Sequence, residues 1–394
     1  MSPLPSTWFF RKPPMRCTSF VLLLLAGGAL LAGGALGAAE GDAPLRDRVT
    51  FRNAPPIDAA EVLSEGSEEL VYKLTSEGNP SRKPSRNVIA VEYVGMKQAG
   101  DWKIATEALA AGQYAAAAAS YAKVAAGPRE WEKVYGALAQ GNALEQDGNY
   151  GEAAKAFHVV VGKFKDHRLW LDAAYREGMA LALAKDATNA EAVAAKLSEQ
   201  AKGKVGPPAE SRAAAIRSAV LYAKGDLAKV VEQVRKVNLR AQSEPDVWFH
   251  FNFWLADAYR KSQKPKDAAR IAETMLASLD EYPVRKAQAV ALKGLSLVES
   301  DPQAALIELL KLDVLPFGSE TQKCEARYQA GVILNAEATR LAAAPDTAKD
   351  EIKKAFVKEL KDTAHLVLTA AAASPVACAA KDKAADLVKN LPPE

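Results

Sequence analysis

The spacing of hydrophobic residues changes once along the chain, near residue 98. Between about residues 45 and 95, apolar residues alternate with polar ones, and segments rich in Gly, Pro, Asn and Ser separate the short runs. Alternation indicates strands, because successive side chains of a strand point to opposite faces. The alternating residues are Val49 and Phe51, then Ile89, Val91 and Tyr93. We therefore predict a β-rich module of four or five short strands, as a small barrel or curled sheet.

From about residue 98 to residue 391 the apolar period is that of a helix, and alanine dominates. Segments such as 137–160, 214–237 and 253–276 resemble one another. Each has a helix ending in a large residue, a polar or glycine turn, and a second helix that carries a small residue. That small residue falls at Ala117, Ala153, Ala190, Val230, Ala268 and Ala305, in steps of 36 to 40 residues. A repeat of this length indicates a solenoid of stacked helix pairs.

The pattern also predicts how the array is interrupted and how it ends. Residues 201–209 read as a linker, and a further unit starts near Glu320. A long helix is expected over about 346–372. The segment CEARYQAGVIL (324–334) aligns without a gap to the lysine-rich CAAKDKAADLV (378–388). We interpret the second copy as a capping helix with a polar outer face.

These residues resemble the tetratricopeptide repeat (TPR) family, an array of antiparallel helix pairs. The best match is at Gly141, Leu144, Gly148, Tyr150, Ala153 and Phe157, and further matches lie at Gly112, Tyr114, Ala117, Tyr121, Ala256, Tyr259, Ala268 and Ala272. At 171–197 only Gly178, Leu181 and Ala190 hold, and the steps slightly exceed the usual family period. The expected fold is mainly α: a TPR-like α-solenoid preceded by a small β-rich module that resembles SH3-like modules of exported bacterial repeat proteins. We expect this module to pack on the helices as a structural cap, with binding of a peptide or the cell wall as the alternative.

The TPR resemblance implies a groove lined by the first helix of each pair. Trp248, Phe251, Leu255 and Tyr259 form a stripe at helical spacing that we expect in the core, so His250 and Phe253 fall outside it. Aromatic and Arg side chains among mixed charges are typical of peptide-binding surfaces. The expected groove residues are Tyr135, Asn142, Asp172, Tyr175, Arg212, Tyr222, His250, Phe253, Asp257, Arg260, Tyr328 and Asn335, with Glu145 and Met179 beside them.

The first 39 residues have the features of a secretory leader. Arg11, Lys12 and Arg16 precede an apolar run of twenty residues, 20–39, that ends in small residues suited to cleavage before Glu40 or before Ala38. The alternative is an uncleaved membrane anchor, since twenty helical residues span about 30 Å. We expect domains at 1–39 (signal peptide or anchor), 45–95 (β-rich module) and 98–391 (helical array). The chain is expected in the periplasm or outside the cell, with membrane contact only through an uncleaved leader.

Composition narrows the function classes. The chain of 394 residues carries 51 basic and 48 acidic residues, and the leader holds three of the basic ones, so residues 40–394 have 48 of each. This balance argues against a sequence-independent nucleic-acid binder, which needs a basic surface. The sequence has no HExxH, GxSxG or P-loop motif, and its four histidines, His158, His167, His250 and His365, are scattered singly. We therefore expect no catalytic site, no metal and no cofactor.

Two of the three cysteines, Cys324 and Cys378, occupy equivalent places in the aligned segments. An oxidising compartment favours a disulfide between them. However, equivalent positions on packed helices lie about 8–10 Å apart, beyond the roughly 7 Å that a disulfide spans between Cα atoms. Two buried thiols are the other possibility, and the sequence leaves both open.

The functional expectation is a non-catalytic protein–protein interaction scaffold of the bacterial cell envelope, with a peptide or protein partner on the groove. An accessory subunit of an envelope or cell-wall-processing enzyme complex is the alternative. A structural, self-associating protein is a third. The sequence does not identify the partner or the oligomeric state.

Overall fold

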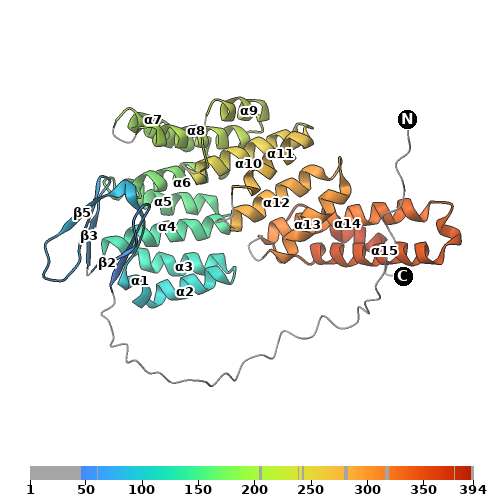
Figure 1. The fold of residues 1–394 in the computed structure, drawn as a ribbon, viewed down its shortest axis with the longest axis horizontal. Coiled ribbons are helices and arrows are strands. Elements are labelled where there is room, and N and C mark those ends of the chain that lie inside the picture. Colours follow the sequence, from blue (N-terminus) through green and yellow to red (C-terminus); the bar gives the residue numbers. More distant parts are fainter. Residues whose placement is uncertain are drawn as a thin grey trace, which may run out of the picture. The chain divides into compact units, whose positions relative to one another are not determined.

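The computed structural model describes residues 46–59, 61–203, 206–237, 239–241, 244–278, 283–315, 319–376 and 378–391. The expected leader therefore lies outside the described residues. The chain is mainly helical, with a small β-rich part at residues 47–92 (Figure 1). Among the described residues, no helix is both long enough and apolar enough to cross a membrane.

The β-rich module consists of two three-stranded antiparallel sheets that share one core, rather than one sheet of four or five strands. Their strand orders are β2-β1-β6 and β3-β4-β5. Asp47 joins the two, because its carboxylate accepts the backbone N–H of Val62 at 2.8 Å and that of Val94 at 2.9 Å. The strands are β1 (Asp47–Phe51), β2 (Ile57–Ala59), β3 (Glu61–Glu65), β4 (Glu69–Lys73), β5 (Ser81–Pro84) and β6 (Val88–Glu92).

The predicted alternation is confirmed at Val49, Phe51 and Val91, which are buried, but it is wrong at Ile89, whose exposed fraction is 57%. The register between β1 and β6 shifts after Thr50, so that Phe51 pairs with Val88. Such an irregularity adds a residue to one strand and reverses the faces beyond it. Val88 therefore takes the inward position that the alternation assigns to Ile89.

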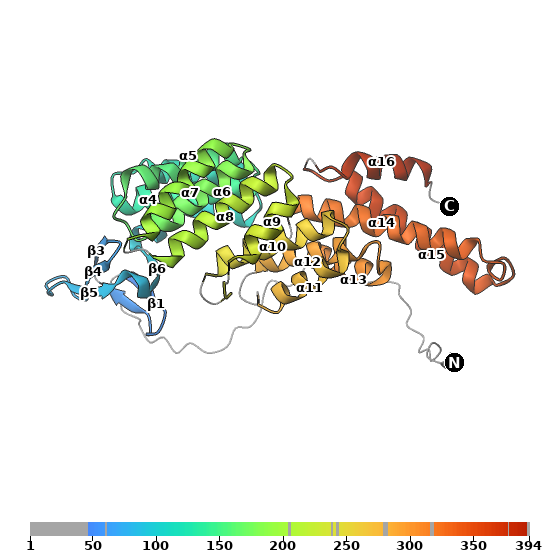
Figure 2. The same ribbon diagram turned by 90° about the horizontal axis from the view of Figure 1, so that it is seen from above.

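Helices α2 to α13 form antiparallel pairs in which each helix packs on the next along the chain (Figure 2). The linker at 201–209 and the unit starting at Glu320 are confirmed by the ends of α7, α8 and α14. The helices are α1 (Val94–Gln98), α2 (Gly100–Ala110), α3 (Tyr114–Ala125), α4 (Glu130–Gln146), α5 (Tyr150–Lys163), α6 (Trp170–Leu183), α7 (Ala187–Ala201), α8 (Pro207–Ala223), α9 (Leu227–Arg235), α10 (Pro245–Lys261), α11 (Pro265–Leu276), α12 (Pro283–Leu297), α13 (Pro302–Val314), α14 (Glu320–Ala342), α15 (Glu351–Ala372) and α16 (Lys381–Asn390), with short 3₁₀ turns at Ser85–Asn87 and Thr347–Lys349.

The repeat read from the sequence corresponds to a repeated turn. All six small residues, from Ala117 to Ala305, lie on second helices and are fully buried. Five residues before each of the first five, the backbone has a positive φ of 58° to 77°, at Gly112, Gly148, Lys185, Gly225 and Gln263. In each of these turns the next residue donates its N–H to the carbonyl five positions earlier, which ends the first helix in the same way. The helix pairs are therefore copies of one unit.

Glycines let helices approach closely at two places in this array. A Cβ on Gly141 of α4 would stand 2.4 Å from the ring of Phe157 in α5, and one on Gly178 of α6 would stand 2.3 Å from Ile216 in α8. Real Cβ atoms do not approach that closely, so neither position accepts a larger residue without a shift of its neighbour. The TPR-like match at Gly141 thus has a packing reason.

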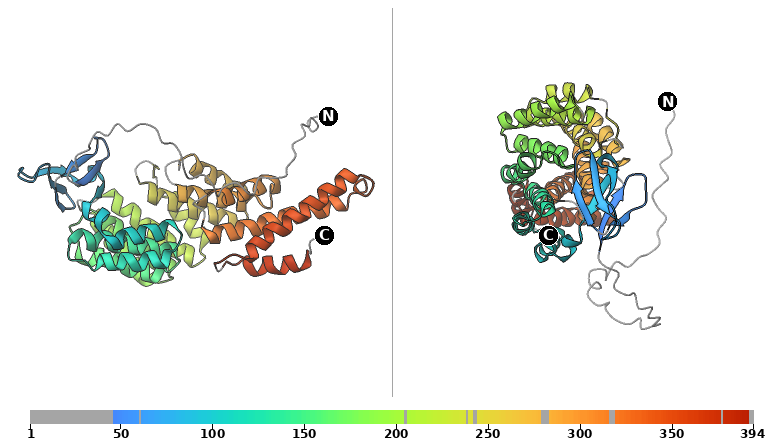
Figure 3. Two further views of the ribbon diagram at one scale, coloured as in Figure 1. Left: turned by 90° about the horizontal axis from the view of Figure 1, so that it is seen from below. Right: turned by 90° about the vertical axis from the view of Figure 1, so that its left-hand side faces the viewer.

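The C-terminal part differs from the pairs before it. Helices α14 and α15 are 23 and 22 residues long and pack side by side, and the shorter α16 packs on both (Figure 3, left). The long helix expected over 346–372 begins at Glu351, because residues 347–349 form a 3₁₀ turn. Leu368, Ala371 and Ala384 form the buried cluster beneath α16. The helix expected at the end of the array is confirmed, and it covers apolar side chains of α15.

The β-rich module is fixed to the helices through the segment before α6. Ser67 donates its N–H to the carbonyl of Asp166 at 2.5 Å, and Arg168 donates its N–H to the carbonyl of Glu65 at 3.0 Å. Gly66 and His167 form a β-bridge. The expectation that this module packs on the helices is therefore confirmed.

Candidate peptide-binding surface

Polar and aromatic side chains from five first helices meet in one connected group, which we term the central cluster. Its anchor is Tyr175 in α6, whose hydroxyl lies 2.7 Å from Nδ1 of His250 in α10. The two residues are 75 positions apart, and packing of α10 against α8 and α6 brings them together. The cluster comprises Glu145, Asp172, Tyr175, Arg176, Arg212, Glu244, Asp246, His250 and Arg285.

Arg212 in α8 is the most connected cation of the central cluster. It donates to Asp172 at 2.7 Å and to Glu244 at 2.7 Å, and its guanidinium stacks 5.9 Å from the ring centroid of Tyr175. Glu244 is further held by the hydroxyl of Ser211 at 2.8 Å. The side chain of Asp172 remains 54% exposed. A planar guanidinium held at two edges and one face is rigid, so the groups around it are presented in fixed positions.

Arg176 in α6 connects this group to the neighbouring helices. Its guanidinium lies 3.3 Å from the carboxylate of Glu145 in α4 and 3.8 Å from that of Asp246 in α10. Asp246 also accepts a hydrogen bond from Arg285 of α12. Ion pairs that cross from one unit to the next join α4, α6, α10 and α12, so the surface does not belong to any single repeat.

Burial among these charges shifts the pKa values of two groups. Burial raises the pKa of Glu145 to about 7, and the nearby Arg176 opposes this without reversing it. Burial lowers the pKa of His250 to about 4; Asp246 opposes the change, whereas Arg285 and Arg176 add to it. At neutral pH His250 is therefore uncharged, and Glu145 is shared between its charged and neutral forms.

A second group lies nearby, at the C-terminal ends of α8 and α10. The hydroxyl of Tyr222 donates to Asp257, which also pairs with Arg260 at 2.6 Å and with Lys261 at 2.9 Å. Lys261 in turn stands 4.6 Å from the centroid of the Tyr222 ring. Burial would raise the pKa of Asp257, but the hydrogen bond from Tyr222 and the two cations outweigh it and lower the pKa. The carboxylate is buried, whereas Arg260 and Lys261 remain partly exposed.

Seven of the twelve expected groove residues therefore fall in these two groups: Asp172, Tyr175, Arg212, Tyr222, His250, Asp257 and Arg260. Met179 is buried in the main core. Phe253 is half-buried and packs against the cluster of Trp248, Phe249 and Met275. Its place between helices makes it a packing residue rather than an open contact. Of the expected core stripe, Trp248, Phe251 and Tyr259 are buried and Leu255 is half-buried.

The remaining expected groove residues lie elsewhere on the array. Tyr135 is hydrogen-bonded to Glu65 of the β-rich module at 2.8 Å. Asn142 lies in α4, and its buried Oδ1 has no hydrogen-bond partner. Tyr328 packs against the apolar cluster beneath α16, and Asn335 follows it on α14. The structure does not bring Tyr328 or Asn335 into contact with the central cluster.

A buried ion pair that the sequence did not reveal fixes the β-rich module in place, and we call it the Glu65 cluster. Only 1% of the Glu65 side chain is exposed, and it accepts hydrogen bonds from Arg168 (2.5 Å), Tyr93 (2.7 Å) and Tyr135 (2.8 Å), with His167 at 3.7 Å. Burial would raise its pKa, but His167 and Arg168 outweigh burial and lower the pKa from 4.5 to about 2. The residues come from separate parts of the chain, so no local motif marks them.

The histidines have separate partners, as their scattered positions suggest. His158 lies 2.7 Å from Glu177, and Nδ1 of His365 lies 2.6 Å from the carbonyl oxygen of Leu391. Within the described ranges, no group of three or more His, Cys, Asp or Glu side chains is arranged to hold a metal ion.

Cys324 and Cys378 form a disulfide with a Cα–Cα distance of 6.5 Å. Of the two possibilities left open by the sequence, the structure thus has the bridge. The estimate of 8–10 Å was wrong because it placed both residues on packed helices. Cys378 instead lies in the loop before α16, which can approach α14 more closely than a helix axis can.

A scan against protein-family models and a search of curated proteins gave no match for this chain. The TPR resemblance therefore rests on the residues quoted above.

Proposed function

We propose that this chain is a non-catalytic interaction scaffold that binds an extended peptide or protein segment across the first-helix face of its TPR-like array. The observation that carries the proposal is the central cluster. Residues that are separated by up to 140 positions, from Glu145 to Arg285, form one continuous polar and aromatic surface. Such continuity over several repeats suits a ligand that runs along the array.

The chemistry of the surface favours a peptide of mixed polarity. Arg176, Arg260 and Lys261 offer donors, while Asp172 and Asp246 offer acceptors, and all five are partly exposed. A peptide backbone needs both donors and acceptors. Tyr and Arg side chains that are already held by neighbours lose little further entropy on binding, which favours affinity. A polyanionic ligand is not favoured, because acids and bases alternate across the surface.

We further propose that the chain acts in the cell envelope or outside the cell. The leader is the first support, and the Cys324–Cys378 bridge is the second, since disulfides persist in oxidising compartments. We expect the chain recovered from an envelope fraction to begin at Ala38 or Glu40, as measured by N-terminal sequencing. A chain recovered from the cytoplasm would contradict this part of the proposal.

The binding face is tested by affinity capture from envelope extract with a tagged full chain, followed by mass spectrometry. Arg212→Ala removes the central cation, and Asp172→Lys reverses an exposed charge without opening the core. We expect each to reduce recovery of the captured protein at least roughly tenfold, a typical loss for a central contact. Arg217→Ala is the matched control, because Arg217 lies on the same helix and pairs with Glu191 of α7 at 2.9 Å.

Circular dichroism should show that all three variants keep their helical content. Capture that is unchanged by both Arg212→Ala and Asp172→Lys contradicts binding on this face. Equal loss in the Arg217→Ala control contradicts it as well, because that result indicates a general loss of structure.

A further inference from the structure

The disulfide between Cys324 and Cys378 is unevenly buried. Cys324, in the second turn of α14, is fully buried, whereas Cys378 is half-buried. Cys378 lies outside any helix, in the loop that joins α15 to α16. One sulfur of the bond is therefore held in the core of the C-terminal part, and the other belongs to a segment without regular hydrogen bonding.

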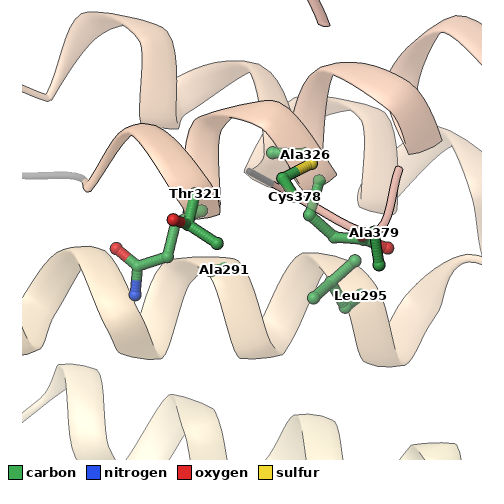
Figure 4. Close-up of a pocket in the computed structure, with 8 residues that line it drawn as sticks. Ala291, Leu295, Thr321, Ala326, Cys378 and Ala379 are labelled. Carbon is green, nitrogen blue, oxygen red and sulfur yellow. The ribbon is translucent and has the colours of Figure 1, made fainter. Parts of the chain in front are cut away.

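Cys378 also lines a cavity of about 260 Å³ between α12, α14 and the loop (Figure 4). Ala291 and Leu295 form the α12 side of the cavity, Ala326 belongs to the α14 side, and Ala379 follows Cys378 in the loop. The walls are almost entirely apolar. The cavity is large enough for a small side chain or a thiol compound to enter and reach Cys378, and Cys324 does not line it.

The bond holds α16 at its root. Helix α16 has only ten residues, and Ala384 is its one fully buried residue within the described range. Its other attachments are two hydrogen bonds, from Lys381 Nζ to the carbonyl of Ser374 at 2.6 Å and between His365 and the carbonyl of Leu391. An isolated helix of this length is not stable in water. The position of α16 therefore depends on the bridge.

From these observations we propose that Cys378 is a site of thiol–disulfide exchange and that its reduction releases α16. A thiolate of a dithiol reductant attacks Sγ of Cys378 from the cavity and forms a mixed disulfide, while Cys324 leaves as a thiolate and takes a proton from solvent. The second thiolate of the reductant then attacks its own sulfur in the mixed disulfide and frees Cys378, which is protonated. Two electrons pass from the dithiol, which becomes a disulfide, to the bridge, which becomes two thiols.

Release of α16 changes the surface of the array. Leu368 and Ala371 of α15 are fully buried while α16 is docked, together with Ala384. In the reduced chain these side chains become accessible. The C-terminal end of the solenoid thus has a covered form when oxidised and an uncovered apolar form when reduced.

The exchange site is tested on the full chain with Cys17→Ser, so that only the two bridged cysteines can react. The native protein is treated with glutathione, free thiols are alkylated, and the products are mapped by mass spectrometry. We expect glutathione on Cys378 and the alkyl label on Cys324. Glutathione on Cys324, or reaction only after denaturation, overturns the proposal.

The role of the cavity is tested by Ala379→Trp, which places a large side chain at its mouth, with Ala379→Ser as the matched control. Because Ala379 is an exposed loop residue, both variants should fold. We expect glutathione to react roughly tenfold more slowly with the Trp variant and at an unchanged rate with the Ser variant, since access controls exchange. Equal rates in the two variants contradict entry through the cavity.

The release of α16 is measured by hydrogen exchange of the chain before and after dithiothreitol treatment. We expect amides of α16 to exchange at least about 30-fold faster after reduction, as for a segment that has lost a covalent tether. Cys378→Ser should show the same increase without reductant. Amides of α4 and α5 serve as the internal reference. Unchanged exchange in α16 refutes the switch even where Cys378 reacts.

Discussion

The Glu65 cluster allows a quantitative prediction about how the β-rich module is held. Glu65→Gln keeps the shape of the side chain but removes the charge that pairs with Arg168. The guanidinium of Arg168 is itself almost fully buried, so the variant leaves a cation without its counter-ion. Loss of one partner of a buried pair costs about 3–5 kcal/mol.

The pKa of Glu65 gives an independent value for the same interaction. Lowering the pKa from 4.5 to about 2 corresponds to about 3 kcal/mol, since each factor of ten in acidity is worth about 1.4 kcal/mol. The folded-state pKa is the lower one, so the charged form stabilises the folded protein. This stabilisation is complete above pH 4.5 and is lost as the pH falls from 4.5 towards 2.

The assay is urea unfolding of the wild type and of Glu65→Gln from pH 7 to pH 3, with limited proteolysis at residues 46–92 to follow the module itself. We expect the variant to be about 3 kcal/mol less stable at pH 7, with a difference that shrinks below pH 4.5. Glu69→Gln is the matched control, because Glu69 pairs with Arg82 at 2.9 Å but both side chains are at least half exposed. That pair should contribute no more than about 1 kcal/mol.

Two results refute the reasoning. A Glu65→Gln variant as stable as the wild type at pH 7 shows that the ion pair does not hold the module. A difference that stays constant from pH 7 to pH 3 shows that the effect is one of packing, because an electrostatic effect must follow the titration of Glu65.

Two further predictions concern the repeat unit. Gly141→Ala should lower the free energy of unfolding by about 1–3 kcal/mol, because the new methyl meets Phe157, whereas Gly151→Ala, with open space around its Cα, should raise it by about 0.5–1 kcal/mol; denaturant unfolding of both variants checks this, and equal effects contradict the packing role of Gly141. Lys185→Gly should stabilise the α6–α7 pair by about 0.5–1 kcal/mol, because Lys185 has a φ of 64°, which glycine adopts without strain; slower hydrogen exchange in α7 is the measurement, and faster exchange contradicts a strained turn.

The sequence by itself determined the repeating part of the fold. Ala153 and Ala268 illustrate why: a second helix that packs closely on its neighbours needs a small residue at one fixed place in each unit, so the requirement leaves a periodic trace. The turn at Gly148 leaves a similar trace, because a positive φ favours glycine. At Lys185 and Gln263 the same turn carries other residues, and the local signal is weaker.

Only the tertiary structure decided which side chains meet. Ile89 faces solvent because of a register shift, and register depends on the partner strand rather than on the sequence of one strand. The contact between Tyr175 and His250, and that between Glu65 and Arg168, join residues 75 and 103 positions apart. Cys378 reaches Cys324 because its loop leaves the helical spacing. Periodicity reports the face on which a residue lies, whereas pairing between faces depends on how the helices pack on one another.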